Sequence, residues 1–260
     1  MRYEEFPVEP ELRHLVVNFW LFATDERDPP RFEHTIVPDG TSAIGFSRPS
    51  RFADGFAVFV GPRVTAAKVE VVAGGRYCGI RFQPGAGGAA LRLRIDSLRD
   101  RHGLLSMVSP DAANVVVDAM RGAAGDGDEL DALRRIASNL AKDAQPVDAI
   151  VARAVENIVD SDGLARVSEV ADGIGVGERT LQRRFRAAVG LTPKEFARMR
   201  RIRRACLLAL NDRESGLAGV SSDAGFADQA HLTREFSGVF GWSPRLTLAY
   251  LDRIEHGNIT

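Results

Sequence analysis

Cysteine is scarce in this sequence, and so are long apolar runs. Cys78 and Cys206 are the only two cysteines in 260 residues, which excludes a disulfide framework and a zinc site built from cysteines. No run of about 18 apolar residues that could span a membrane is found. The first residues, MRYEEFPVEPE, are acidic and lack the apolar segment of a secretory signal. We therefore expect a cytoplasmic protein with no membrane contact.

Charge of one sign is not in excess either. The chain has 34 basic and 35 acidic residues and a formal net charge of −1. This excludes a chain uniformly coated with positive charge for nucleic acid, but leaves local patches open. The five histidines show no His-x-His spacing, so a cluster of metal ligands is not expected. We expect no metal, no cofactor and no catalytic residue, and thus not an enzyme.

The first hundred residues have the pattern of short strands separated by turns. Such spacing is typical of a mainly-β sandwich or small barrel, and we expect this domain to cover residues 1–108. The turn signals are Asp39-Gly40, Gly61-Pro62, Gly74-Gly75 and Pro84-Gly85. The expected strands are Val16–Phe22, Thr35–Val37, Ser42–Phe46, Phe56–Val60, Lys68–Val72 and Tyr77–Phe82.

The middle of the chain, residues 109–146, is predicted to be a helical connector. Within Glu129–Lys142, apolar residues recur at helical spacing and form one narrow seam. The seam consists of Leu130, Leu133, Ala137 and Leu140. Such a seam packs either on its own domain or against the same helix of a second copy, and both alternatives are open. After Gln145-Pro146 the pattern is helical throughout, so a second domain is expected at 147–252.

This second domain contains an internal repeat. The segment that starts at Val170 matches the segment that starts at Val220 in the type and order of seven residues. The remaining pairs are Gly175 with Gly225, Leu181 with Leu232, Arg183 with Arg234, Phe185 with Phe236, Gly190 with Gly241 and Pro193 with Pro244. The pattern of each copy predicts a helix, a glycine-containing turn and a second helix. We therefore predict an all-α domain with helix-turn-helix units at about 167–186 and 217–237.

The outward face of each second helix carries residues suited to DNA. Arg, Gln and Thr side chains at helical spacing can reach base edges and phosphates in a major groove. The candidate DNA-binding residues are Arg179, Gln182, Arg183 and Arg186 in the first unit and Gln229, Ala230, Thr233 and Arg234 in the second. An exposed helix often carries such residues for solubility alone. Their recurrence in both copies favours DNA binding.

A linker helix is expected between the two units, at about 193–210. Its length of roughly 27 Å is close to the ~34 Å between successive major-groove faces on one side of B-DNA. Residues 179–204 hold ten basic groups and one acidic residue, Glu195. Such a local excess is a footprint for phosphate. Arg198 and Arg201 are the predicted phosphate contacts.

At residues of about 148–252, the sequence resembles the DNA-binding domain of AraC/XylS-type regulators. The matching motifs are Glu178-Arg179-Thr180-Leu181-Gln182-Arg183-Arg184-Phe185, Gly190-Leu191-Thr192-Pro193, Arg201-Ile202-x-x-Ala205, Ala224-Gly225-Phe226 and Phe240-Gly241-x-Ser243-Pro244. The resemblance implies seven helices, two helix-turn-helix units on a rigid linker helix, and transcription regulation at promoters, including activation. By this resemblance, the eight outward residues named above are the positions closest to the bases.

The first half looks like the cupin-like sensor domain of one branch of these regulators. Pro38-Asp39-Gly40 and Arg81-Phe82-x-Pro84-Gly85 carry this likeness. This likeness implies a small-molecule effector and a homodimer. The resemblance of the second half implies double-stranded promoter DNA and RNA polymerase as further partners. The candidate effector-pocket residues are Trp20, Phe46 and Arg81.

Two alternatives remain open at this point. The chain could be a constitutive DNA-binding regulator whose first half only dimerises, or the β domain could be a cupin-type enzyme. The sequence also departs from the family pattern in the second unit. Ser221 and Ser222 stand where larger or more apolar residues are usual, and Gly238 lies in a helical segment. We therefore expect the second unit to be less stable or less sequence-specific than the first.

Overall fold

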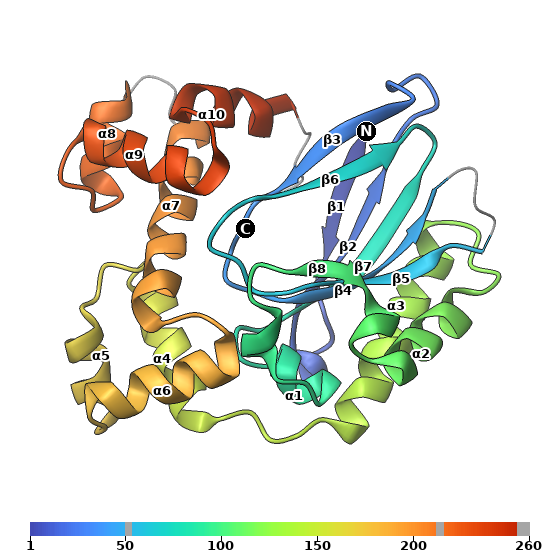
Figure 1. The fold of residues 1–260 in the computed structure, drawn as a ribbon, viewed down its shortest axis with the longest axis horizontal. Coiled ribbons are helices and arrows are strands. Elements are labelled where there is room, and N and C mark those ends of the chain that lie inside the picture. Colours follow the sequence, from blue (N-terminus) through green and yellow to red (C-terminus); the bar gives the residue numbers. More distant parts are fainter. Residues whose placement is uncertain (50–53, 212–215, 254–260) are drawn as a thin grey trace.

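The computed structural model of the chain describes residues 1–49, 54–211 and 216–253 (Figure 1). Residues 50–53 and 212–215, which fall inside the two predicted domains, and residues 254–260 lie outside the described residues. A mainly-β half is followed by helices only. The predicted fold class, a β-rich N-terminal part followed by a helical connector and an all-α C-terminal part, is thereby confirmed.

The described part of the N-terminal half contains two antiparallel sheets. The larger has six strands in the order β1-β2-β7-β4-β5-β8, and the smaller is a two-stranded ribbon of β3 and β6. The strands are β1 (Arg2–Phe6), β2 (Val16–Ala23), β3 (Arg31–Ile36), β4 (Ala43–Arg48), β5 (Phe56–Val60), β6 (Ala67–Val72), β7 (Arg76–Phe82) and β8 (His102–Leu104). The six predicted strands are all present, while β1 and β8 were not predicted.

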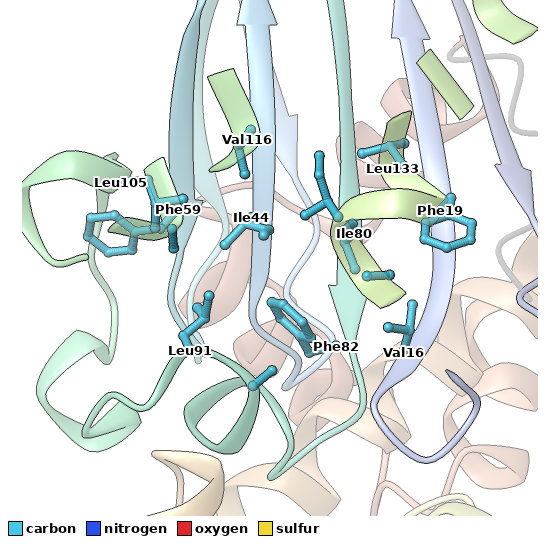
Figure 2. Close-up of a cluster of buried hydrophobic side chains, with 14 of the residues drawn as sticks. Val16, Phe19, Ile44, Phe59, Ile80, Phe82, Leu91, Leu105, Val116 and Leu133 are labelled. Carbon is cyan, nitrogen blue, oxygen red and sulfur yellow. The ribbon is translucent and has the colours of Figure 1, made fainter. Parts of the chain in front are cut away.

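Helices cover one face of the six-stranded sheet. They are α1 (Gly87–Leu91), α2 (Pro110–Met120) and α3 (Asp126–Asp143), with 3₁₀ turns η1 (Pro10–Leu12), η2 (Ile95–Leu98) and η3 (Leu105–Met107). Figure 2 shows Val116 of α2 and Leu133 of α3 beside Phe19, Ile44 and Ile80 of the sheet, and all five side chains are almost fully buried. This core holds the helices on the sheet.

The apolar seam of the connector is part of this core. Leu133 and Ala137 are buried in it, and Leu130 and Leu140 pack against it. The first of the two alternatives for the seam is therefore correct, because the seam packs on its own domain.

The C-terminal part is built from seven helices among the described residues. They are α4 (Ala149–Asp160), α5 (Val167–Ile174), α6 (Glu178–Val189), α7 (Pro193–Asn211), α8 (Gly216–Asp223), α9 (Gln229–Phe240) and α10 (Pro244–Arg253). Helices α6 and α9 end alike, because Gly190 and Gly241 follow them with φ of +81° and +72°. Glycine adopts this left-handed conformation without strain, so both helices stop at equivalent positions.

Each helix-turn-helix unit has its own core, and α7 contributes to both. Phe196 of α7 packs with Leu181 and Phe185 in the first core. Ile202 packs with Phe236 in the second. Because one continuous helix is anchored at both ends, it acts as a rigid spacer between the two units.

The β domain packs against both units. Arg99, just after η2, donates to Glu195 at the start of α7, with distances of 2.7 and 3.1 Å. At the second unit, the backbone N–H of Ala66 donates to the carbonyl of Val239 at 2.7 Å. The N–H of Thr35 on β3 donates to the hydroxyl of Tyr250 on α10 at 2.6 Å. The two halves of the chain are thus joined at two separate places.

Candidate nucleic-acid interface and effector cavity

In the first unit, α6 buries one face and exposes the other. Leu181 and Phe185 are fully buried, whereas all four predicted residues, Arg179, Gln182, Arg183 and Arg186, are exposed. Gln182 donates to Glu178 on the same helix at 2.8 Å. For the guanidinium groups of the three arginines, no hydrogen bond or ion pair is found within the described residues. Three positive charges therefore face away from the protein.

In the second unit, α9 is oriented in the same way but carries less charge. Gln229, Ala230 and Arg234 are exposed and Thr233 is half-buried. The Thr233 hydroxyl donates to the carbonyl of Gln229 at 2.8 Å. At the start of the helix, the Asp228 side chain accepts from the N–H of His231 at 2.6 Å, which satisfies one of the free N–H groups of the first turn.

The turns before α6 and α9 place the two helices equivalently. Gly175 and Gly225 both have positive φ, of +80° and +74°, and lie at matching positions of the repeat. Between the units, the 19 residues of α7 span about 28 Å. The structure therefore holds the two exposed helix faces at the two ends of one helix.

The basic run on α7 is partly used within the protein. Arg198 forms an ion pair with Glu235 of α9, and Arg204 pairs with Asp162 at 2.7 Å. Arg201 lies over the ring of Phe226 at 5.5 Å from its centroid. Both predicted phosphate contacts, Arg198 and Arg201, are thus engaged inside the domain, and their contact with DNA remains a prediction.

A cavity of about 370 Å³ is the second candidate site. It lies between the uncovered face of the six-stranded sheet and the β3–β6 ribbon, and it is mostly apolar. Its floor includes Gly45 of β4, which pairs with Gly79 of β7. The indole of Trp20 lies over them, and a Cβ on Gly79 would approach the indole to 2.5 Å. Glycine is needed here because any side chain would displace Trp20.

Two of the three predicted pocket residues line this cavity. Trp20 and Arg81 do so, but Phe46 does not. Successive side chains of a strand point to opposite faces, and Phe46 points into the helix-covered core, where it is 2 % exposed. Phe46 therefore does not line this cavity, and its part in an effector pocket stays a prediction.

Arg81 is surrounded by groups that compensate its charge. It donates to Glu5 at 2.9 Å, and its Nε lies 3.4 Å from Asp39. Burial lowers the pKa of Arg81, but Asp39, Tyr3 and Glu5 outweigh this and raise the pKa overall. Burial also raises the pKa of Tyr3, which stays neutral. Arg81 thus belongs to a paired polar cluster.

The helical domain forms part of the cavity wall. Arg203 and Cys206 of α7 and Leu251 of α10 border the cavity. Cys206 is buried, and its burial raises its pKa to about 12. The thiol of Cys78 is also buried, and its pKa is raised. Neither cysteine has the lowered pKa and exposure of a reactive thiol.

The described residues contain neither a candidate metal site nor a candidate membrane-spanning helix. Among them, no group of three or more His, Cys, Asp or Glu side chains is placed to hold a metal ion. Within the same ranges, none of the helices combines the length and apolar character needed to cross a bilayer.

Comparison with known proteins supports the assignment of the helical domain. Residues 170–249 match a family model described as a helix-turn-helix domain. Residues 4–103 match a model described as a domain of unknown function. The HTH-type transcriptional activators RhaS of Escherichia fergusonii and of Escherichia coli O157:H7 are each 34 % identical over 76 residues, or 29 % of this chain. The match spans 27 % of the length of these relatives.

Solved structures of ToxT from Vibrio cholerae resemble the chain over most of its length. An apo variant of strain SCE256 has a TM-score of 0.47 at 12 % identity, covering 90 % of this chain and 97 % of that one. The unsaturated fatty acid-bound wild type has a TM-score of 0.45 at 13 % identity, covering 93 % and 97 %. The family match and the helix-turn-helix relatives confirm the resemblance of the second half. The C-terminal part of this chain is therefore a helix-turn-helix domain built from two such units and similar to the AraC/XylS type, and it follows a mainly-β N-terminal domain.

Proposed function

We propose that this chain is a sequence-specific DNA-binding regulator of transcription. The observation that carries the proposal is the duplicated helix-turn-helix unit, in which α6 and α9 each expose a polar face at one end of the rigid helix α7. Recognition helices of such units enter the major groove of DNA. The two helices would read adjacent major grooves on the same face of one duplex.

Within this proposal, Arg183 and Arg234 have equivalent roles. They occupy matching positions of the repeat, and both are exposed. An arginine in the major groove can donate two hydrogen bonds to a guanine, which is the commonest base-specific contact. The remaining candidates, among them Arg179, Gln182 and Gln229, lie on the same faces and would contact neighbouring bases or phosphates.

Control by a small molecule is the second part of the proposal. The cavity of the β domain is bordered by Arg203 and Leu251 of the helical domain, so a bound ligand would contact both halves of the chain. A ligand that binds one arrangement of the two halves better than another shifts their populations. This favours an effector domain over a purely constitutive regulator. The proposed partners are promoter DNA, RNA polymerase, the effector and a second copy of the chain, in the cytoplasm.

Capture of genomic DNA fragments tests the DNA-binding part directly. The full chain is incubated with a fragment library at two salt concentrations, and bound fragments are sequenced. We expect one enriched motif that persists at the higher salt, because base contacts depend less on salt than phosphate contacts do. The double variant R183A/R234A should lose the motif, and R121A, at an exposed arginine that follows α2, should keep it. A wild type that captures only salt-sensitive, unrelated fragments would contradict the proposal.

A further inference from the structure

Arg63, which follows β5, lines the cavity and is only 9 % exposed. Its Nε donates to the carbonyl of Thr65 at 3.1 Å, and its Nη1 lies 3.5 Å from Nδ1 of His102. Neither partner carries negative charge. Burial and the nearby Arg63 lower the pKa of His102, which keeps its ring neutral. Among the described residues, no carboxylate lies within ion-pair distance of Arg63, and Asp100 acts on it only from farther away.

A buried arginine without a counter-ion is unfavourable in a folded protein. An arginine side chain does not release its proton in proteins, so its charge must be compensated in some other way. Burial lowers the pKa of Arg63, which reflects this cost. In the same cavity, Arg81 is compensated by both Glu5 and Asp39. The contrast singles out Arg63 as the cation that is open to an external anion.

A second positive charge borders the same cavity. Arg203 of α7 is half-buried, and no hydrogen bond or ion pair is found for it among the residues that the structure describes. Its charge lowers the pKa of Cys206, although burial dominates there. Arg203 therefore adds to a positive potential inside the cavity, from the side of the helical domain.

Much of the rest of the cavity suits an apolar ligand body. The wall and floor are formed by apolar and aromatic side chains from both sheets, with Trp20, Phe22 and Val58 on the large sheet and Val69 and Val71 on the ribbon. The volume of about 370 Å³ equals that of about a dozen water molecules in the liquid. It lies within the usual range for small-molecule sites, about 300–1,000 Å³.

We propose that this cavity binds an organic acid with an apolar body, whose carboxylate is held by Arg63. A guanidinium donates two parallel hydrogen bonds to a carboxylate, and such charge-assisted bonds are strong in a buried site. The aromatic and aliphatic walls then bury the body of the ligand. The regulatory meaning of this binding rests on the function proposed above, since the ligand would contact α7, but the binding itself does not depend on it.

Paired probes test the proposal. Decanoate is compared with 1-decanol, and 3-phenylpropanoate with 3-phenyl-1-propanol, in titrations of the full chain. Trp20 reports occupancy through its fluorescence, after the second tryptophan has been replaced in the background variant W242F. Calorimetry on the unmodified chain gives an independent affinity. We expect each acid to bind more tightly than its alcohol, by roughly tenfold to a hundredfold, because only the acid forms a charge-assisted bond.

Three variants separate the contributions. R63Q should remove the preference for the acids and leave binding of the alcohols unchanged. It should also raise the melting temperature of the free protein, because an uncompensated buried charge is removed. V58F fills part of the cavity and should weaken the binding of acids and alcohols alike. R94Q, at an arginine whose side chain is 85 % exposed, is the matched control and should bind as the wild type does.

Three results would overturn the proposed binding of carboxylates by Arg63. Alcohols that bind as tightly as the acids, or an R63Q variant that keeps the preference for acids, would overturn the proposal. So would a complete lack of saturable binding by either carboxylate. DNA binding is measured separately by capture of fragments. A chain that binds the acids but no specific DNA would refute the proposed function and leave this inference standing.

Discussion

The two helix-turn-helix units share one architecture but differ in charge. Each exposes one face of its second helix, yet α6 presents Arg179, Arg183 and Arg186, whereas α9 presents Arg234 as its only arginine. In the second unit, Glu235 pairs with Arg198 of the linker helix, which neutralises a charge close to the recognition face. From this difference and the proposed function, we predict that the first unit contributes more to the affinity for DNA and to its salt dependence.

The units also differ in how they are held against the β domain. The first is joined through an ion pair, Arg99 with Glu195. The second is joined through an aromatic cluster, in which the hydroxyl of Tyr250 lies 3.0 Å from His34 and Lys68 lies over the ring of Trp242. The two junctions therefore differ in kind, with an ion pair at the first unit and mainly aromatic contacts at the second.

The largest expected effect concerns the cores, where the two units should not differ. Phe185 and Phe236 occupy matching positions and are 0 % and 1 % exposed. Replacing either by Ala should cost about 3–5 kcal/mol of unfolding free energy, because each leaves a large cavity. Urea denaturation of the two variants provides the measurement. A loss below about 1 kcal/mol for F236A alone would show that the second unit is loosely packed, which contradicts its buried core.

The recognition faces should differ in DNA binding. We expect R183A and R234A each to weaken binding to the captured site by about 1–3 kcal/mol. R183A should have the larger effect, because its unit carries most of the free charge. Titrations of a labelled duplex at several salt concentrations measure both the affinity and the salt slope. Equal effects of the two variants, with equal slopes, would show that the difference in charge has no role in binding.

A glycine in each unit tests their relative stability. Gly238 lies inside α9, and Gly173 lies inside α5. A Cβ at Gly238 would meet only the flexible end of Arg198, at 3.4 Å, and one at Gly173 would meet nothing within 4 Å. G238A and G173A should each stabilise the protein, by up to about 1 kcal/mol. Thermal unfolding checks this, and a destabilised G238A would show that the contact with Arg198 requires the glycine.

The smallest effect concerns the ion pair at the first unit. Burial raises the pKa of Glu195, but the N–H of Thr192 and the guanidinium of Arg99 outweigh this and lower the pKa overall. A lowered pKa in the folded state contributes stability above the unfolded pKa, and this contribution is lost as the pH falls through the folded pKa. E195Q should therefore cost about 1 kcal/mol or less at pH 7 and lose stability less steeply on acidification.

Denaturation between pH 7 and pH 3 measures this difference. The control is D131N, which removes an exposed carboxylate that pairs with Arg134 on the same helix. This variant should follow the pH dependence of the wild type. An E195Q variant that also follows the wild type would show that the ion pair does not stabilise the junction.

The sequence predicted the helical domain well because its signals are local. Glycines that end helices and buried residues spaced by four, such as Leu181 and Phe185, are visible in the sequence itself, and the repeat doubled the evidence. The same holds for strands with alternating apolar residues. Strand β1, RYEEF, was not predicted because three of its five residues are charged, and its Glu5 is used to compensate Arg81 across the sheet.

The cavity could be predicted only in part. Which face of a strand meets the helices depends on the register of the whole sheet. The sequence therefore did not separate Trp20, which lines the cavity, from Phe46, which points into the core. Arg63 gave no sequence signal, because its significance lies in the absence of a carboxylate within ion-pair distance in the described part of the fold. The engagement of Arg198 by Glu235 was also hidden, since these residues lie on different helices that meet only in the folded domain.

The central claim is that two rigidly spaced helices read adjacent major grooves of one duplex. The most direct measurement is the affinity of the full chain for the captured site after five base pairs are inserted between its two halves. Because α7 fixes the distance between the units, half a turn of DNA moves one groove to the opposite face. We expect the affinity to fall at least as far as R234A lowers it on the unchanged site, since only one half can be read. An affinity unchanged by the insertion would contradict the account.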